Sequence, residues 1–229
     1  VADAALVLET IAGYDAMDPT SLNRPAERFS QTLRVRTARL RIGVVRRPYF
    51  DELDADIESA VNAAIKVLHG MTAGTRDVEL PYSNVLMTIA SAEAYAYHKP
   101  YFTETPELYQ DMTRQRLQLA ATISAADYAN ALREMQHLRS QADNAFGDVD
   151  LLVTPTTALA PISIAAGHLD PPLPADGTPR EFRNTHMFDM LGLPAISVPC
   201  GFTREGLPIG LQIAGPRFAE SRVLALAHA

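Results

Sequence analysis

The sequence has few of the residues from which disulfides, metal sites and phosphate sites are built. Cys200 is the one cysteine among 229 residues, so by itself it forms neither an internal disulfide nor a zinc site. The six histidines are scattered without the spacing of metal ligands, and we expect no metal site. No Gly-Gly pair, Gly-x-Ser-x-Gly motif or glycine-rich phosphate loop is present. Lys66 and Lys99 are the only lysines, and Lys66 is expected at the surface of its helix.

An excess of positive charge and long apolar runs are also missing. Lys and Arg number 20 against 27 Asp and Glu, a net charge of −7 without a basic cluster, so we expect no nucleic-acid partner. The longest uncharged stretch, 151–167, is interrupted by Pro155 and Pro161. It is shorter than the roughly 20 apolar residues of a membrane-spanning helix. The first residues, Val1-Ala2-Asp3, resemble no signal peptide. We therefore expect a cytoplasmic protein without a membrane partner.

The composition is that of a globular protein, with 47% hydrophobic and 21% charged residues. Apolar spacing predicts helices over 3–12, 53–70, 83–98, 106–122, 125–146 and 184–191. Short apolar and β-branched runs predict strands over 40–45, 75–80, 150–155, 195–199 and 209–213. The strand–helix–strand order over 40–80 predicts a right-handed parallel crossover. The order of elements indicates the α/β class.

Polar residues mark several expected helix ends and loops. Asp3 and Ser124 are predicted N-caps, and Gly13 is predicted to end the first helix. The loop 166–181 is expected to border a pocket. A group of carboxylates around residue 53 is either an acid/base pair or a set of charges that stabilises a helix N-terminus, and we favour the second interpretation. These carboxylates are Asp51, Glu52, Asp54, Asp56 and Glu58.

Three threonines and the cysteine are the candidate reactive groups. Thr154, Thr156 and Thr157 follow a strand, and active-site residues of open α/β sheets gather at the carboxyl ends of strands. The same hydroxyls also satisfy loop backbone groups, which is the interpretation we favour. Cys200 is a possible nucleophile, but because no basic partner is recognisable we favour an unreactive buried thiol. From the residues alone, the sequence indicates a soluble α/β domain and names no activity.

Ordered motifs run along almost the whole chain. GLPAISVPCGF at 192–202 is followed by GLPIGLQIAGP at 206–216, and DVDLLVTPT stands at 148–156. RIGV stands at 41–44, and the segment 1–21 combines a helix with an Asp-Pro-Thr-Ser loop. Together these stretches resemble the amidase signature family, whose enzymes hydrolyse carboxamides with a Ser–cis-Ser–Lys triad.

The resemblance implies a mixed β-sheet covered by helices, with no cofactor. It places residues 1–229 in the C-terminal part of a single amidase signature domain, apparently cut at both ends. The family's Lys, cis-Ser and nucleophilic Ser belong to the N-terminal half, so the resemblance assigns no catalytic residue to this segment. Since that mechanism needs the Lys to deprotonate the cis-Ser, we expect this segment alone to be inactive.

The resemblance also suggests two substrate-binding residues. Arg116 stands where the A subunits of glutamyl-tRNA amidotransferases carry an Arg near the substrate carboxylate, although a surface arginine is the alternative. Thr185 is expected to line the pocket or to cap the short helix that follows it. The resemblance also implies that those A subunits carry an acidic residue about ten positions before the Gly-Leu-Pro-Ala motif, and this chain has Phe182 at that position. This difference favours an amidase for small molecules over a component of a tRNA-dependent amidotransferase.

The expected partners follow from that choice. They are a small-molecule amide substrate and the missing N-terminal half of the same domain. A second copy of the chain, in a homodimer, is a further possible partner. The A subunit of a tRNA-dependent amidotransferase, with tRNA and partner subunits, is the alternative enzyme. A non-catalytic fragment or interaction subunit is the alternative outside the enzymes. A module that folds on its own is disfavoured, because a sheet divided at Val1 would expose strand edges and apolar faces.

Overall fold

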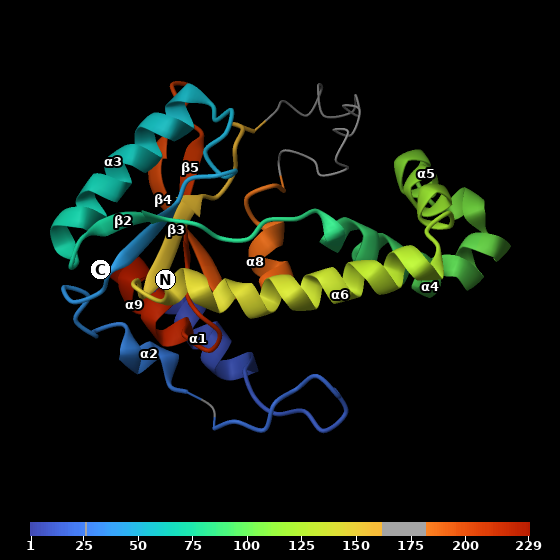
Figure 1. The fold of residues 1–229 in the computed structure, drawn as a ribbon, viewed down its shortest axis with the longest axis horizontal. Coiled ribbons are helices and arrows are strands. Elements are labelled where there is room, and N and C mark those ends of the chain that lie inside the picture. The colour runs from blue at the N-terminus through green and yellow to red at the C-terminus, as the bar shows by residue number, and fades with distance from the viewer. Residues whose placement is uncertain (26, 162–181) are drawn as a thin grey trace.

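A mixed β-sheet forms the centre of the fold (Figure 1). The computed structural model describes residues 1–25, 27–161 and 182–229, so the predicted pocket-bordering loop 166–181 lies outside the described residues. Within these residues the sheet has five strands in the order β2-β1-β3-β5-β4. The strands are β1 (Ile42–Val45), β2 (Thr75–Val78), β3 (Leu151–Pro155), β4 (Ala195–Phe202) and β5 (Pro208–Ala214).

The direction of the strands confirms the predicted fold class. Strand β1 pairs with β2 and β3 in parallel, while β5 pairs with β3 and β4 in antiparallel fashion. The parallel pair β1–β2 is joined by a helix, as the strand–helix–strand pattern predicts. The described helices are α1 (Ala2–Ile11), α2 (Phe29–Thr32), α3 (Ala55–Met71), α4 (Val85–Glu104), α5 (Asp111–Ala120), α6 (Ala125–Ala142), α8 (His186–Leu191) and α9 (Glu220–His228), with short 3₁₀ turns η1 (Pro106–Leu108) and η2 (Asp143–Phe146).

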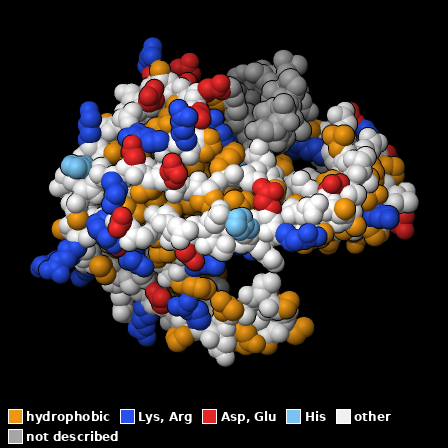
Figure 2. Space-filling view, viewed as in Figure 1, with side chains coloured by type: hydrophobic (Ala, Val, Ile, Leu, Met, Phe, Trp, Pro, Cys, Tyr) orange, Lys and Arg blue, Asp and Glu red, His pale blue; other side chains and the backbone are white. Residues whose placement is uncertain are grey.

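Helices cover both faces of the sheet because its strands alternate apolar side chains between two cores. On β3, Leu151 and Val153 pack with α3 and α9, whereas Leu152 packs with α6 and α8. Helices α4, α5 and α6 extend beyond the sheet as an arm, with α4 packed on both α5 and α6 (Figure 1). No helix of the described residues is both long enough and apolar enough to span a membrane. On the face seen in Figure 2, acidic and basic side chains are interspersed.

Of the two predicted N-caps, Ser124 is confirmed. The Ser124 side chain accepts a hydrogen bond from the Asp127 backbone N–H, and the Asp127 carboxylate accepts one from the Ser124 N–H, which is a complete capping box. Asp54 caps α3 by accepting from the Asp56 N–H. Hydrogen bonds from the Arg204 backbone N–H and, to a lesser extent, from the Arg204 side chain lower the pKa of Asp56 below its usual value. For Asp54 and Asp56, the structural interpretation is therefore confirmed.

The predicted start of the first helix is wrong. Val1 is the N-cap of α1, so Asp3 lies inside the first turn, where its charge faces the positive end of the helix. The predicted apolar face is also only partly buried. Ala5 is fully buried against Phe29 and Leu224, whereas Ile11 is 74% exposed. Hydrophobic side chains are visible at this end of the molecule in Figure 2.

Asp150 joins the beginnings of β1 and β3. Its carboxylate accepts from the Arg41 backbone N–H at 2.8 Å and from the Arg41 guanidinium at 3.2 Å. The guanidinium hydrogen bonds lower the pKa of Asp150. A lowered native pKa gives stability that is present above the unfolded pKa, about 4, and is lost as the pH falls through the native pKa.

Replacing Asp150 with asparagine should therefore destabilise the protein at neutral pH, and the difference should shrink as the pH falls below about 4. Urea unfolding between pH 2.5 and 7 measures this. Asp148→Asn is the matched control, because the Asp148 side chain is 73% exposed and its ion pair is with the exposed Arg76. A loss of stability for Asp150→Asn that stayed constant with pH would contradict the expectation.

Candidate functional site

The three threonines at the carboxyl end of β3 have different surroundings. Thr154 is fully buried, and its hydroxyl accepts a hydrogen bond from Gln212 Nε2 at 3.0 Å. The Thr156 hydroxyl lies 2.7 Å from the Ser197 hydroxyl on β4. Thr157 donates to the Leu159 carbonyl at 3.2 Å. The favoured interpretation, in which these hydroxyls satisfy local backbone groups, is thus correct for Thr157 but wrong for the other two, which bond to side chains from β5 and β4.

The register of the sheet explains why these groups meet. Thr154 and Ser197 both pair with Gln212, from opposite sides of β5. Because successive residues of a strand point to opposite faces, Thr156 and Gly210 follow two residues further along that same face. One face of the sheet therefore carries a polar row that runs from the buried interior to the exposed edge of β4.

A buried amide network fixes the inner half of this row. Asn184 is fully buried, and its Nδ2 donates to the Tyr49 carbonyl at 3.0 Å and to the Pro155 carbonyl at 2.9 Å. Gln212 Nε2 donates to the Asn184 carbonyl at 2.8 Å as well as to Thr154. The two amides thus hold three segments together: the loop after β1, the end of β3 and the chain before α8. Buried polar groups are expected to be paired in this way.

Aromatic packing surrounds that network. The Tyr49 ring is fully buried, edge-on to Tyr82 at a centroid distance of 6.1 Å and tilted against Phe188 at 5.8 Å. Among the described residues its hydroxyl has no hydrogen-bond partner, and burial raises the pKa of the phenol well above its usual value. Arg183 Nη2 donates to the Asp51 carbonyl at 2.6 Å. These contacts tie the chain before α8 to the loop after β1.

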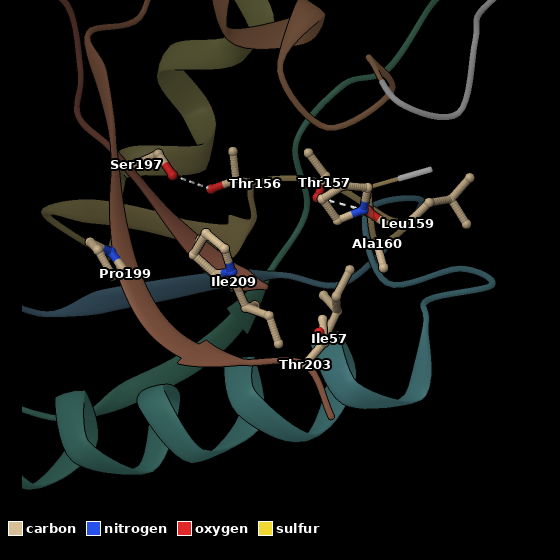
Figure 3. Close-up of a pocket in the computed structure, with 12 residues that line it drawn as sticks. Ile57, Thr156, Thr157, Leu159, Ala160, Ser197, Pro199, Thr203 and Ile209 are labelled. Carbon is tan, nitrogen blue, oxygen red and sulfur yellow. Dashed lines mark hydrogen bonds between the residues drawn. The ribbon is translucent and has the colours of Figure 1, made fainter. Parts of the chain in front are cut away.

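The outer half of the polar row opens into a pocket of about 520 Å³ (Figure 3). The Thr156 and Ser197 side chains point toward each other at one side of it. Gly210 lies beneath this pair, where a Cβ would stand 2.5 Å from Ser197 Oγ and 2.7 Å from Thr156 Oγ1. Glycine is therefore required if both hydroxyls are to keep their positions. The apolar part of the lining includes Ile57, Leu159, Pro199, Pro208 and Ile209.

The two predicted substrate-binding residues lie outside the lining of this pocket. Arg116 is exposed on α5, in the arm, whereas α8 lies beside the sheet (Figure 1). Thr185 directly precedes α8 and donates to the Phe182 carbonyl at 3.3 Å. Thr185 is the N-cap residue of α8, as the alternative predicts, but its side chain makes no capping hydrogen bond. The structure does not bring Arg116 and Thr185 together, and their role in substrate binding stays a prediction.

The remaining candidate groups are not arranged for reaction. Cys200 is half-buried on β4, where burial raises the pKa of its thiol and favours the protonated form. Lys66 is exposed on α3, as predicted. Among the described residues, His, Cys, Asp and Glu side chains form no group of three that would hold a metal ion.

Sequence reasoning missed Asn184, Gln212 and Ser197. A signal for Gln212 was present, because it interrupts the apolar strand Ile209–Ile213. A polar side chain in a buried strand needs a partner. Identifying that partner as Thr154 required the pairing of β3 with β5.

Comparison with known proteins gives a consistent family assignment. The family model described as Amidase matches residues 1–224. An amidase of Pseudomonas putida is 33% identical over 90% of this chain and 46% of its own length. The A subunit of the glutamyl-tRNA(Gln) amidotransferase from Listeria innocua is 34% identical over 100% of this chain and 52% of its own length. The chain thus spans about half the length of these relatives.

The fold has the same relatives. A bacterial aryl acylamidase, described as belonging to the amidase signature enzymes, superposes with a TM-score of 0.85 over 99% of this chain and 50% of its own. At 24% sequence identity this likeness concerns the fold alone. It agrees with the mixed sheet and its two helical layers.

Proposed function

Because the chain belongs to the amidase family, we propose that the protein containing it hydrolyses the C–N bond of a carboxamide, releasing ammonia or an amine and a carboxylic acid. The observation that carries this proposal is the family match over residues 1–224, which spans nearly the whole chain. The amidase of Pseudomonas putida, 33% identical over 90% of this chain, supports it.

The proposed chemistry is that of a Ser–cis-Ser–Lys triad located in an N-terminal half that precedes this segment. Residues 1–229 then form the C-terminal part of one domain, and this part alone is inactive. Two features support such a partner segment. Strand β4 ends the described sheet with one edge unpaired, and Leu6, Val7 and Ile11 of α1 are exposed. Free strand edges and apolar helix faces are normally covered.

In this proposal the chain supports the reaction and supplies part of the substrate pocket. The substrate is a small amide, and the protein is cytoplasmic. Whether the protein forms a homodimer is not part of the proposal. Arg116 and Thr185 are the substrate contacts that the family resemblance suggests. The A subunit of a tRNA-dependent amidotransferase is the second candidate, because one such protein is 34% identical over the whole chain. Phe182, which stands where those proteins carry an acidic residue, favours the amidase.

The test is an assay of the longer protein, in which an amidase N-terminal half precedes this chain. We expect it to release ammonium from neutral primary carboxamides without tRNA or partner subunits. Ammonium is measured with a coupled dehydrogenase assay against a buffer blank. Release from glutamine that appeared only with tRNA and partner subunits would favour the amidotransferase. The absence of release from every amide under both conditions would contradict both candidates.

A further inference from the structure

The hydroxyl pair of Thr156 and Ser197 has hydrogen-bonding capacity to spare. Their oxygens are 2.7 Å apart, so one hydroxyl donates to the other. That bond uses one of two protons and one of four lone pairs, which leaves one O–H donor and several acceptor positions at the pocket. A primary carboxamide presents the complement, because its carbonyl accepts and its NH₂ donates.

The other hydroxyls of the pocket are engaged with their own loops. Thr157 donates to the Leu159 carbonyl, and the Thr203 hydroxyl accepts from the Leu207 N–H at 3.1 Å. Thr203 is also buried, so among the described lining residues the Thr156–Ser197 pair is where two accessible hydroxyls lie within hydrogen-bond distance of each other. Thr156 is half-buried and Ser197 is exposed, so a ligand can reach both.

The rest of the lining selects against charge. None of the described lining residues has an ionisable side chain, and the walls formed by Ile57, Leu159 and Ile209 are apolar. A carboxylate or ammonium ion would lose hydration here without gaining an opposite charge. A volume of about 520 Å³ falls within the usual range for small-molecule sites.

We infer that this pocket binds neutral carboxamides, with the amide group on the Thr156–Ser197 hydroxyl pair and an apolar substituent against Ile57 and Ile209. One hydroxyl donates to the amide carbonyl, while a hydroxyl oxygen accepts from the amide NH₂. The interpretation of this ligand as a substrate rests on the proposed function, but the binding itself does not. The preferred ligands of the pocket are then uncharged amides with an aliphatic or aromatic substituent, rather than amides that carry a carboxylate.

The test titrates the ¹⁵N-labelled 229-residue chain with isobutyramide, isobutyrate and N,N-dimethylisobutyramide. We expect isobutyramide to shift the backbone signals of Ser197, Ile209 and Gly210. Isobutyrate, which has the same shape but is charged, should bind much more weakly. The dimethyl amide should also bind more weakly, because it has no N–H to donate.

Two substitutions probe the site from different sides. Ser197→Ala should weaken isobutyramide binding by about 2- to 12-fold, the equivalent of one net hydrogen bond. Gly210→Ala should abolish binding, because its methyl group would occupy the space of the two hydroxyls. Ser140→Ala is the matched control, because this exposed serine on α6 donates to the His137 carbonyl of its own helix and lies outside the pocket lining. If the Gly210→Ala variant fails to fold, the affinity of Ser197→Ala for isobutyramide still tests the inference.

With this chain, three results would overturn the inference: no shift at the pocket, equal or tighter binding of isobutyrate, or unchanged affinity in Ser197→Ala. Binding to this chain but not to a longer chain that hydrolyses amides would also overturn it, by assigning the pocket to a contact inside the protein. Failure of the proposed function has a different signature, since the longer chain would then release no ammonium while isobutyramide still shifted the pocket signals.

Discussion

Replacing Asn184 with alanine is expected to lower the free energy of unfolding by about 3 kcal/mol, since two buried carbonyls lose a donor and each such loss costs about 1–3 kcal/mol. The carbonyls are those of Tyr49 and Pro155, which lie 3.0 and 2.9 Å from Asn184 Nδ2. Tyr49 O keeps only a long contact of 3.5 Å with Arg183. Because the same change frees the chain before α8 from the sheet, the signals of Thr185 should broaden. Urea unfolding and NMR line widths measure both effects.

Two matched variants separate this effect from ordinary side-chain deletion. Asn144→Ala removes an exposed asparagine near the end of α6 and should change stability by less than about 0.5 kcal/mol. Tyr49→Phe removes a buried hydroxyl that has no partner among the described residues, so it should be neutral or stabilising. If Asn184→Ala were as mild as Asn144→Ala, the buried amide would not hold these segments together.

The sequence was sufficient to predict the framework. Strands β1 and β3 are short apolar runs, and α3 has apolar residues at helical spacing from Ile57 to Leu68, so local patterns define them. The capping box at Ser124 is equally local, because its partners are three residues apart. Parallel pairing of β1 with β2 follows from the helical crossover, α3, that joins them. Each of these features depends on residues that are close together along the chain.

The pocket and the amide network depend on residues that are far apart along the chain. Gln212 meets Thr154 only because β5 pairs with β3, across 58 residues of sequence. Ser197 meets Thr156 only because β4 adds to β5 in a particular register. A shift of one residue would turn both side chains to the opposite face. The spacing within α1 likewise indicates an apolar face but not what covers that face.

One polar row thus serves two purposes. At its inner end, Asn184 and Gln212 close the row with buried hydrogen bonds and give it rigidity. At its outer end, Thr156 and Ser197 leave hydrogen-bonding capacity open to the pocket. A binding group supported by a packed second layer of hydrogen bonds is held in position more firmly than one on a free loop. Weakening Asn184 should therefore also loosen the end of β3 that carries Thr156.

The 229-residue chain alone is expected to hydrolyse neutral amides no faster than buffer, whereas the longer protein proposed above should exceed it by about 10⁶-fold, the loss seen when a catalytic triad is removed. Amide hydrolysis needs a nucleophile activated by a base. In the described residues, Ser197 bonds to Thr156 rather than to a base, and burial keeps the Cys200 thiol protonated. The two lysines, Lys66 on α3 and Lys99 on α4, are both exposed.

Ammonium release from isobutyramide and benzamide, by the chain and by the longer protein at equal concentration, measures this ratio. Circular dichroism of the chain must first show the helix content of a folded protein, because an unfolded chain would be inactive for a trivial reason. Ser197→Ala and Cys200→Ala should leave the background rate of the chain unchanged. Hydrolysis by the chain that either substitution removed would place a working nucleophile within residues 1–229. The triad would then not be the source of the activity, and the hydroxyl pair would be a site of chemistry rather than of binding.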